Sequence, residues 1–158
     1  MSEPAPSTKD ALTGWLWVAA QAAILAAVIV LPGNSHWPLP EWLRVITNLL
    51  FFGGLGLLGA AALKLGSALT PTPVPKDASS LTTDGLYRFM RHPIYTGVLI
   101  TVTAMVLRSG SVWHLAIGAT AVIFFDRKAA WEEIRLAERY PDYADYASRT
   151  ARFVPRVW

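Results

Sequence analysis

Four apolar runs without any Asp, Glu, Lys or Arg constrain the fold of this chain more than any other feature. They cover residues 11–40, 45–63, 92–107 and 109–125. A helix that spans a bilayer needs about 20 mostly apolar residues. The first two runs reach that length, and the last two are shorter and share one break at Arg108-Ser109-Gly110. The runs predict an all-α membrane protein.

Composition supports this class. Hydrophobic residues make up 53% of the 158 residues and charged residues only 16%, whereas a soluble domain carries about 25% charged residues. A chain this short cannot bury so much apolar surface in one water-soluble core. The chain has no Cys, which excludes a disulfide framework, a thiolate metal site and a Cys nucleophile.

The runs predict a polytopic protein with about four transmembrane helices, the last two forming a short hairpin, plus a C-terminal interfacial helix. No small-residue cleavage site follows the first run, so we expect a retained span and not a signal peptide. Residues 1–158 are expected to form one membrane-embedded domain, with two N-terminal helices in 1–69 and a donor-binding core in 70–158. Small residues let membrane helices approach closely, so Gly53, Gly56 and Gly59 are expected to pack the bundle.

The basic residues predict the orientation. If four segments cross and the N-terminus is cytoplasmic, twelve of the fourteen Lys and Arg residues lie inside, and only Arg44 and Arg108 lie outside. The positive-inside rule favours this arrangement. We therefore expect an integral, multi-pass protein with both termini in the cytoplasm and its basic face against membrane lipids.

A polar cluster precedes the third apolar run. His92-Pro93 puts a proline where a helix can begin, so the backbone N–H groups of that helix start beside Arg91. A helix N-terminus with a guanidinium is suited to a carboxylate or a phosphate. The alternative is that Arg88 and Arg91 only anchor the protein to lipid phosphates.

A second cluster follows the fourth run. Residues 126–139 have helical character, and Glu132 and Glu133 stand close to the bilayer exit. Such a pair of acids can receive an ammonium group or ribose hydroxyls, or it can be a solvated helix face.

The two clusters together resemble the isoprenylcysteine carboxyl methyltransferase family and the related small membrane phospholipid methyltransferases. The resemblance rests on GLYRFMRHPIYTG, then an apolar hairpin, then EEIRLAERYPDYADY and RFVP, in this order. It covers about residues 71–155. Pro141 stands where the family usually has Gly.

The resemblance implies a helical membrane fold and S-adenosyl-L-methionine as methyl donor. The implied donor contacts are Leu81, Thr82, Tyr87, His92, Pro93, Ile94, Tyr95 and Glu132, and Arg91 and Glu133 belong to the same motifs. The family's substrate-contacting basic position holds Lys128 here, with Arg127 beside it. The Lys ammonium is a point charge and does not have the planar, two-pronged geometry of an Arg guanidinium.

Together these features predict S-adenosylmethionine-dependent methyl transfer to a lipophilic acceptor dissolved in the membrane, which is a carboxylate, a thiol or a lipid amine. Arg91 and His92 are the candidate catalytic residues. Arg91 suits the donor's carboxylate, and His92 is a donor contact or, for an amine acceptor, the nearby base. Two alternatives stay open: an NADPH-dependent membrane reductase of the sterol-reductase type and a non-catalytic membrane scaffold. No metal site and no nucleic-acid partner are expected.

Overall fold

The computed structural model describes residues 8–33, 37–72 and 80–155. Within them the chain forms the helices α1 (Thr8–Val30), α2 (Glu41–Leu65), α3 (Pro93–Ser109), α4 (Val112–Arg139) and α5 (Tyr143–Arg149), with short 3-10 turns η1 (Gly66–Ala68) and η2 (Gly85–Arg88). The all-α class is confirmed. Lys76 and Arg156, both counted above on the inner side, lie outside the described residues.

Two helices are long and apolar enough to cross a membrane. They are α1 and α2, and only 11% and 17% of their most apolar stretches are buried. The core helix of a soluble protein would be mostly buried, whereas these helices expose large side chains such as Trp15, Leu49 and Phe52. The apolar helix α3 is shorter. The structure thus has two to three apolar spans, against the four expected.

The expected short hairpin is present. Helix α3 begins at Pro93 and ends at Ser109, and Gly110 turns the chain with a positive φ of 62°, which glycine adopts without steric cost. One boundary differs from expectation. The polar segment 126–139 is not a separate helix but the second half of α4, because no proline or glycine interrupts the chain between Ala119 and Arg139.

A close crossing joins α2 to α3. A Cβ atom at Gly97 would lie 2.7 Å from the backbone oxygen of Gly54, so the two backbones meet with no side chain between them. The glycines Gly53, Gly56 and Gly59 were expected to pack the bundle, but a Cβ atom at any of them would meet nothing within 4 Å. The expectation was therefore wrong about which glycines form the contact.

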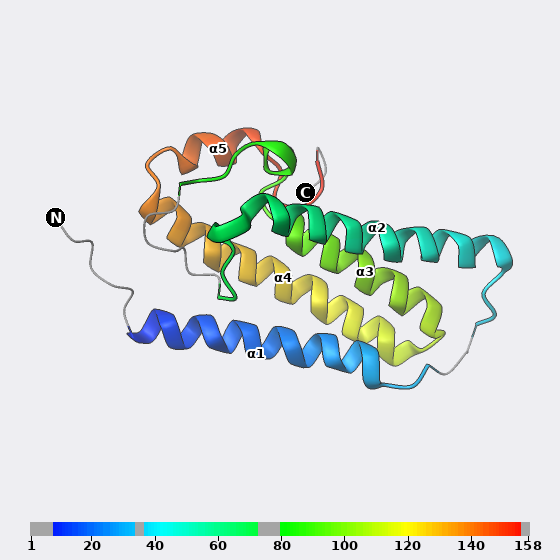
Figure 1. Ribbon diagram of the computed structural model, residues 1–158. Helices are drawn as coiled ribbons and strands as arrows, with labels where there is room; N and C mark the ends of the chain where they lie inside the picture. Colours follow the sequence, from blue (N-terminus) through cyan, green and yellow to red (C-terminus); the bar gives the residue numbers. More distant parts are fainter. Residues whose placement is uncertain (1–7, 34–36, 73–79, 156–158) are drawn as a thin grey trace.

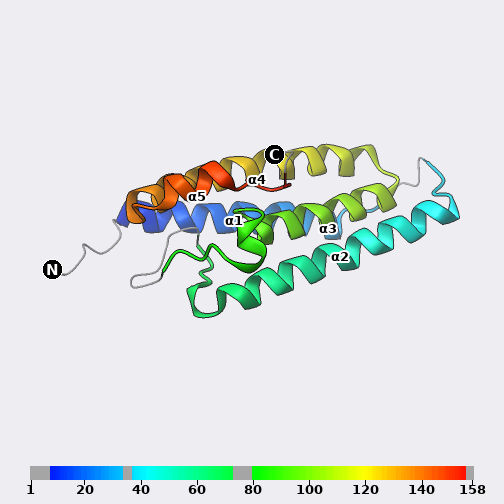
Figure 2. The ribbon, with the colours of Figure 1, turned by 90° about the horizontal axis from the view of Figure 1, so that it is seen from above.

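The helices run side by side, with α3 between α2 and α4 and with α1 along α4 (Figures 1 and 2). Their shared core contains Val28, Val102, Val106 and Phe125. Helix α5 folds back over the end of the bundle where α3 begins. There the segment after α5 pairs with the start of α3 through backbone hydrogen bonds from Arg91 to Ala151 and from His92 to Arg152. The bundle therefore has one end covered by α5 and an opposite end at the α3–α4 turn.

Candidate active site

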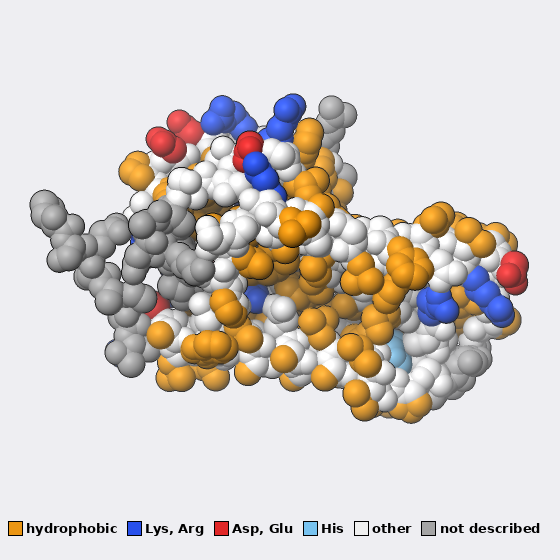
Figure 3. All heavy atoms as spheres, viewed as in Figure 1, with side chains coloured by type: hydrophobic (Ala, Val, Ile, Leu, Met, Phe, Trp, Pro, Cys, Tyr) orange, Lys and Arg blue, Asp and Glu red, His pale blue; other side chains and the backbone are white. Residues whose placement is uncertain are grey.

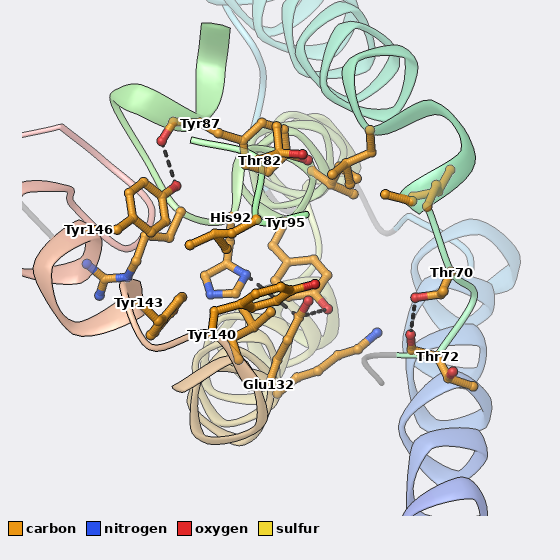
Figure 4. A pocket seen from close by; sticks show the side chains of 18 of the residues that line it. Thr70, Thr72, Thr82, Tyr87, His92, Tyr95, Glu132, Tyr140, Tyr143 and Tyr146 are labelled. Carbon is orange, nitrogen blue, oxygen red and sulfur yellow. Dashed lines mark hydrogen bonds and ion pairs between the residues drawn. The ribbon is translucent and has the colours of Figure 1, made fainter. Parts of the chain in front are cut away.

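A cavity of about 530 Å³ lies at the end of the bundle covered by α5 (Figure 4). Its walls come from α1 at Gln21, from the end of α2 and the loop after it, from η2, from the first turn of α3, from the second half of α4 and from α5. A cavity of this size matches ordinary small-molecule sites, which run from about 300 to 1,000 Å³.

The structure brings most of the sequence-predicted residues together around this cavity. Those that line it are Leu81, Thr82, Tyr87, Arg91, His92, Ile94, Tyr95, Lys128 and Glu132. Three predicted residues do not line it. Pro93 is buried in the first turn of α3, Arg127 is exposed, and Glu133 faces a separate ion-pair network.

Glu132 is the acid that faces the cavity. The hydroxyl of Tyr95 donates a hydrogen bond of 2.7 Å to Glu132 Oε2, and His92 Nδ1 lies 3.7 Å from the same oxygen. The rings of His92 and Tyr95 stack with their planes 2° apart. Because Glu132 Oε1 has no hydrogen bond within the described residues, one carboxylate oxygen is left to meet a ligand.

Glu133 has a different environment although it is the next residue. Its carboxylate contacts Arg91 Nε at 2.8 Å, His92 Nε2 at 3.2 Å and Arg152 Nη2 at 2.7 Å. Burial alone would raise the pKa of Glu133, but hydrogen bonds from His92, Arg152 and Arg91 outweigh it and lower the pKa to about 2. Glu133 therefore joins α3, α4 and the segment after α5.

Arg91 also holds the C-terminal part of the chain. In addition to its bond with Glu133, its Nη1 donates to the backbone oxygens of Ala147, at 2.9 Å, and of Thr150. These oxygens lie at and beyond the end of α5, where carbonyl groups have no partner within the helix. Much of the guanidinium is therefore engaged by the protein itself, although Arg91 also lines the cavity.

Sequence reasoning missed a group of tyrosines. Tyr140, Tyr143 and Tyr146 line the cavity from α5 and the turn before it (Figure 4). The Tyr146 hydroxyl donates to the backbone oxygen of Tyr87 at 2.6 Å, whereas the buried Tyr143 hydroxyl has no partner. Burial raises the pKa of Tyr146 to about 12 and that of Tyr143 as well, so both are donors at neutral pH. The three-residue spacing of these tyrosines was the available signal.

Lys128 stands at the opposite wall, toward α1. Its side chain is only 3% exposed, its ammonium donates to the side-chain oxygen of Gln21 on α1, and it lies 5.1 Å from the centre of the Tyr95 ring. Within the described residues no acid forms an ion pair with Lys128, although the Glu132 carboxylate on the same wall is near enough to interact with its charge. The other residues that sequence reasoning missed come mainly from the end of α2 and the loop after it: Leu65, Ala68, Leu69, Thr70, Pro71, Thr72, Ser80 and Leu136.

A metal centre finds no support in the described part of the chain, where no group of three or more His, Asp or Glu side chains could hold an ion.

Comparison with known families gives one match over most of the chain. The model of the phospholipid methyltransferase family matches residues 42–143. Protein-S-isoprenylcysteine O-methyltransferase A of Arabidopsis thaliana is 30% identical over 138 residues, which cover 84% of this chain and 68% of that protein.

Other relatives carry different names. The nickel-cobalt-cadmium resistance protein NccN of Alcaligenes xylosoxydans xylosoxydans is 29% identical over 143 residues, and the cobalt-zinc-cadmium resistance protein CzcN of Cupriavidus metallidurans is 29% identical as well. Both matches cover 90% of this chain. This chain spans slightly less than two thirds of their length, namely 64% of NccN and 63% of CzcN.

Among solved structures, the chain is similar to the eukaryotic intramembrane Ras methyltransferase, isoprenylcysteine carboxyl methyltransferase. The TM-score is 0.66 at 21% identity, and the match covers 95% of this chain and 52% of that one. The likeness shows a shared fold. Together with the exposed apolar faces of α1 and α2, it indicates an integral membrane protein.

Proposed function

The chain belongs to the family of phospholipid and isoprenylcysteine carboxyl methyltransferases, and on that premise we propose that it transfers a methyl group from S-adenosylmethionine to a lipophilic acceptor. Two polar groups on residues that line the cavity carry the proposal. The Glu132 carboxylate is partly exposed and its Oε1 has no hydrogen bond within the described residues, and the Tyr143 hydroxyl is buried without a partner among them. Buried polar groups are normally hydrogen-bonded, so an unpaired hydroxyl beside an accessible carboxylate favours a polar ligand.

The residues around the cavity fit the donor. Its ammonium and ribose hydroxyls are donors that suit Glu132, and its carboxylate and ring nitrogens are acceptors that suit Tyr143. Its sulfonium is a cation that aromatic faces such as Tyr87 and Tyr140 attract. When bound, S-adenosylmethionine supplies an activated methyl group that a nucleophile can take in an in-line displacement.

The other groups position the site. The stacked rings of His92 and Tyr95 fix the orientation of Glu132. Arg91 and Glu133 hold α5 over the cavity. In this proposal Arg91 contributes its remaining surface to the donor's carboxylate, and His92 acts as a donor contact and a support for the two acids. Positioning of this kind supplies a large part of the rate in a displacement reaction.

Lys128 is the proposed contact for the acceptor. Its unpaired ammonium would attract an anionic headgroup or carboxylate, and a carboxylate acceptor needs no general base. Helix α1 packs on α4 and α3, while α2 packs on α3. Between α1 and α2 the surface is hollowed and lined largely by hydrophobic side chains (Figure 3). An apolar acceptor would enter the site from the bilayer along this hollow.

The donor would arrive from the cytoplasm, with both termini on that side. Labelling of single cysteines tests the orientation, since the chain has no native Cys. The variants Ser148→Cys at the α5 end and Pro38→Cys at the opposite end are both exposed. We expect an impermeant reagent to label only Pro38→Cys in intact cells. Labelling of Ser148→Cys alone would show the opposite orientation, with the α5 end outside the cell, and would contradict the prediction.

The competing enzyme class is tested by ligand choice. The carboxylate of Glu132 would repel the 2′-phosphate of NADPH, because like charges disfavour each other. In isothermal titration, detergent-purified protein is expected to bind S-adenosylhomocysteine and not NADPH. Tight NADPH binding without any response to S-adenosylhomocysteine would contradict the methyltransferase proposal. Donor binding without a methylated product would instead favour a non-catalytic scaffold.

A further inference from the structure

A second cavity lies at the opposite end of the bundle. Its volume is about 420 Å³, and it opens where α1 ends, α2 begins and the α3–α4 hairpin turns. Its lining combines apolar side chains, among them Phe51, Phe52 and Met105, with Arg108 and His114. None of these residues takes part in the site proposed for methyl transfer.

His114 leaves one ring nitrogen unsatisfied in this cavity. The residue is only 3% exposed, and its Nε2 lies 3.3 Å from the backbone oxygen of Val28. Because a carbonyl oxygen can only accept, Nε2 carries the proton and Nδ1 of the neutral ring is an acceptor. Nδ1 is buried and has no partner among the described residues. A ligand that places a hydrogen-bond donor, such as a hydroxyl group, beside His114 would satisfy this nitrogen.

Arg108 brings a positive charge to the same cavity. Its Nη1 donates to the side-chain oxygen of Asn48 on α2, and no acid pairs with it among the described residues. Basic side chains lie over this end of the molecule, near the start of α2, with an acidic side chain beside them (Figure 3). An arginine whose protein partner is a neutral amide retains its attraction for an anion, and its planar fork matches a phosphate.

Part of the apolar lining lies on α2. Phe52 is 68% exposed on α2, and Phe51 packs edge-on against it with ring centres 5.4 Å apart. Helix α2 is one of the two helices apolar enough to span a bilayer. Acyl chains could lie along this face while a headgroup occupies the cavity.

From these three features we propose that the second cavity binds an anionic phospholipid whose headgroup carries a free hydroxyl. The phosphate contacts Arg108, the headgroup hydroxyl donates to His114 Nδ1, and an acyl chain lies along Phe51 and Phe52. The proposal depends on insertion in a membrane but not on methyl transfer, so it can stand or fall independently of the proposed function.

Two short-chain lipids separate the contribution of the headgroup hydroxyl from that of the phosphate charge. Dioctanoyl phosphatidylglycerol has a phosphate and headgroup hydroxyls, whereas dioctanoyl phosphatidylmethanol has the same charge and no hydroxyl. Their affinities would be measured by isothermal titration on the full-length protein in detergent. One neutral hydrogen bond corresponds to a preference of roughly two- to tenfold for phosphatidylglycerol. Glycerol 1-phosphate, which has no acyl chain, is expected to bind far more weakly.

Matched variants assign the contacts. Arg108→Gln is expected to lower the affinity for both lipids by roughly tenfold or more, because a charged partner of the phosphate is lost. His114→Gln can keep a donor for the Val28 carbonyl but has no acceptor at the Nδ1 position, so it should bind the two lipids equally. Arg88→Gln is the control, because Arg88 is exposed at the α5 end. Thermal unfolding without added lipid confirms that each variant is folded.

Three results would overturn the proposal. The first is equal lipid affinity in Arg108→Gln and Arg88→Gln. The second is a preference for phosphatidylglycerol that survives in folded His114→Gln protein. The third is binding of glycerol 1-phosphate as tight as that of the lipid, which would replace a membrane lipid by a soluble phosphate ester.

Discussion

The two ends of the bundle hold their charged groups in opposite ways. At the α5 end, Glu133 contacts Arg91, His92 and Arg152, and Arg152 also contacts Asp126 at 2.9 Å. At the other end, among the described residues, the Arg108 guanidinium donates to a side-chain amide and pairs with no acid. Within the same part of the chain, His114 Nδ1 has no hydrogen-bond partner.

The difference shows where the protein completes its own interactions and where it leaves them for a ligand. The Glu133 network is satisfied internally, so its task is to hold α5 over the large cavity. Among the described residues, Tyr143 at the large cavity and His114 at the smaller one each have a buried polar atom without a partner, and Glu132 Oε1 has no hydrogen bond. Buried polar groups are normally hydrogen-bonded, so an unpaired one on a residue that lines a cavity favours a ligand there.

The largest effect should come from breaking the internal network. Glu133→Gln takes the acid away from Arg91 and leaves Arg152 with Asp126 alone, and removal of one member of a buried ion pair costs about 3–5 kcal/mol. We expect a clear loss of thermal stability in detergent. Glu138→Gln, on the exposed part of the same helix, should change stability by no more than about 0.5 kcal/mol. Equal small effects would mean that Glu133 does not hold the C-terminal segment.

Glu132→Gln should separate binding from stability. Loss of a hydrogen bond to a charged group costs about 1.5–3 kcal/mol, which is roughly ten- to hundredfold in affinity. We expect weaker binding of S-adenosylhomocysteine in isothermal titration and an unfolding temperature close to that of the parent. If Glu132→Gln and the Glu138→Gln control bind alike, the cavity acid has no part in donor binding.

Lowering the pH should reduce the stability of the folded protein by less than the substitution Glu133→Gln does. The pKa of Glu133 is lowered from 4.5 to about 2 in the folded protein. The stabilisation is therefore complete above about pH 4.5 and is lost as the pH falls toward 2. At pH 3 the folded carboxylate is still mostly ionised, so the loss there is partial. Thermal unfolding between pH 6 and pH 3 measures it, and the pH dependence of Glu133→Gln should be flatter than that of the parent.

Tyr143→Phe should give the smallest effect. The variant removes only a hydroxyl that has no partner among the described residues, so stability should stay the same or rise slightly. Donor affinity should fall by roughly two- to tenfold, as expected for one neutral hydrogen bond. Unchanged affinity for S-adenosylhomocysteine would mean that the hydroxyl does not face the donor.

Local signals in the sequence predicted much of this arrangement. Pro93 marked the start of α3 and Gly110 its end, because each has a fixed backbone preference. The ordered motifs led to nine of the residues around the large cavity. The different environments of Glu132 and Glu133 could not be predicted, since they depend on the direction in which each neighbouring side chain leaves α4.

Contacts between distant segments also could not be predicted from the sequence. Gly54, not its neighbours, meets α3, and that choice depends on the rotation of α2 about its axis. Tyr143 enters the cavity only because α5 folds back over it. His114 is in a plain apolar run, and its unsatisfied nitrogen becomes visible only once Val28 of α1 takes the other one.

Transfer of a labelled methyl group tests most directly whether this chain methylates a lipophilic molecule. Purified protein would be incubated with S-adenosylmethionine labelled in its methyl group and with a membrane lipid extract, and the organic phase would be counted. We predict labelled lipid-soluble product with the parent and with Glu138→Gln, and a strong reduction with Glu132→Gln. Label in the organic phase that does not differ between the parent and Glu132→Gln, or no label above background in protein that binds the donor, would contradict the claim.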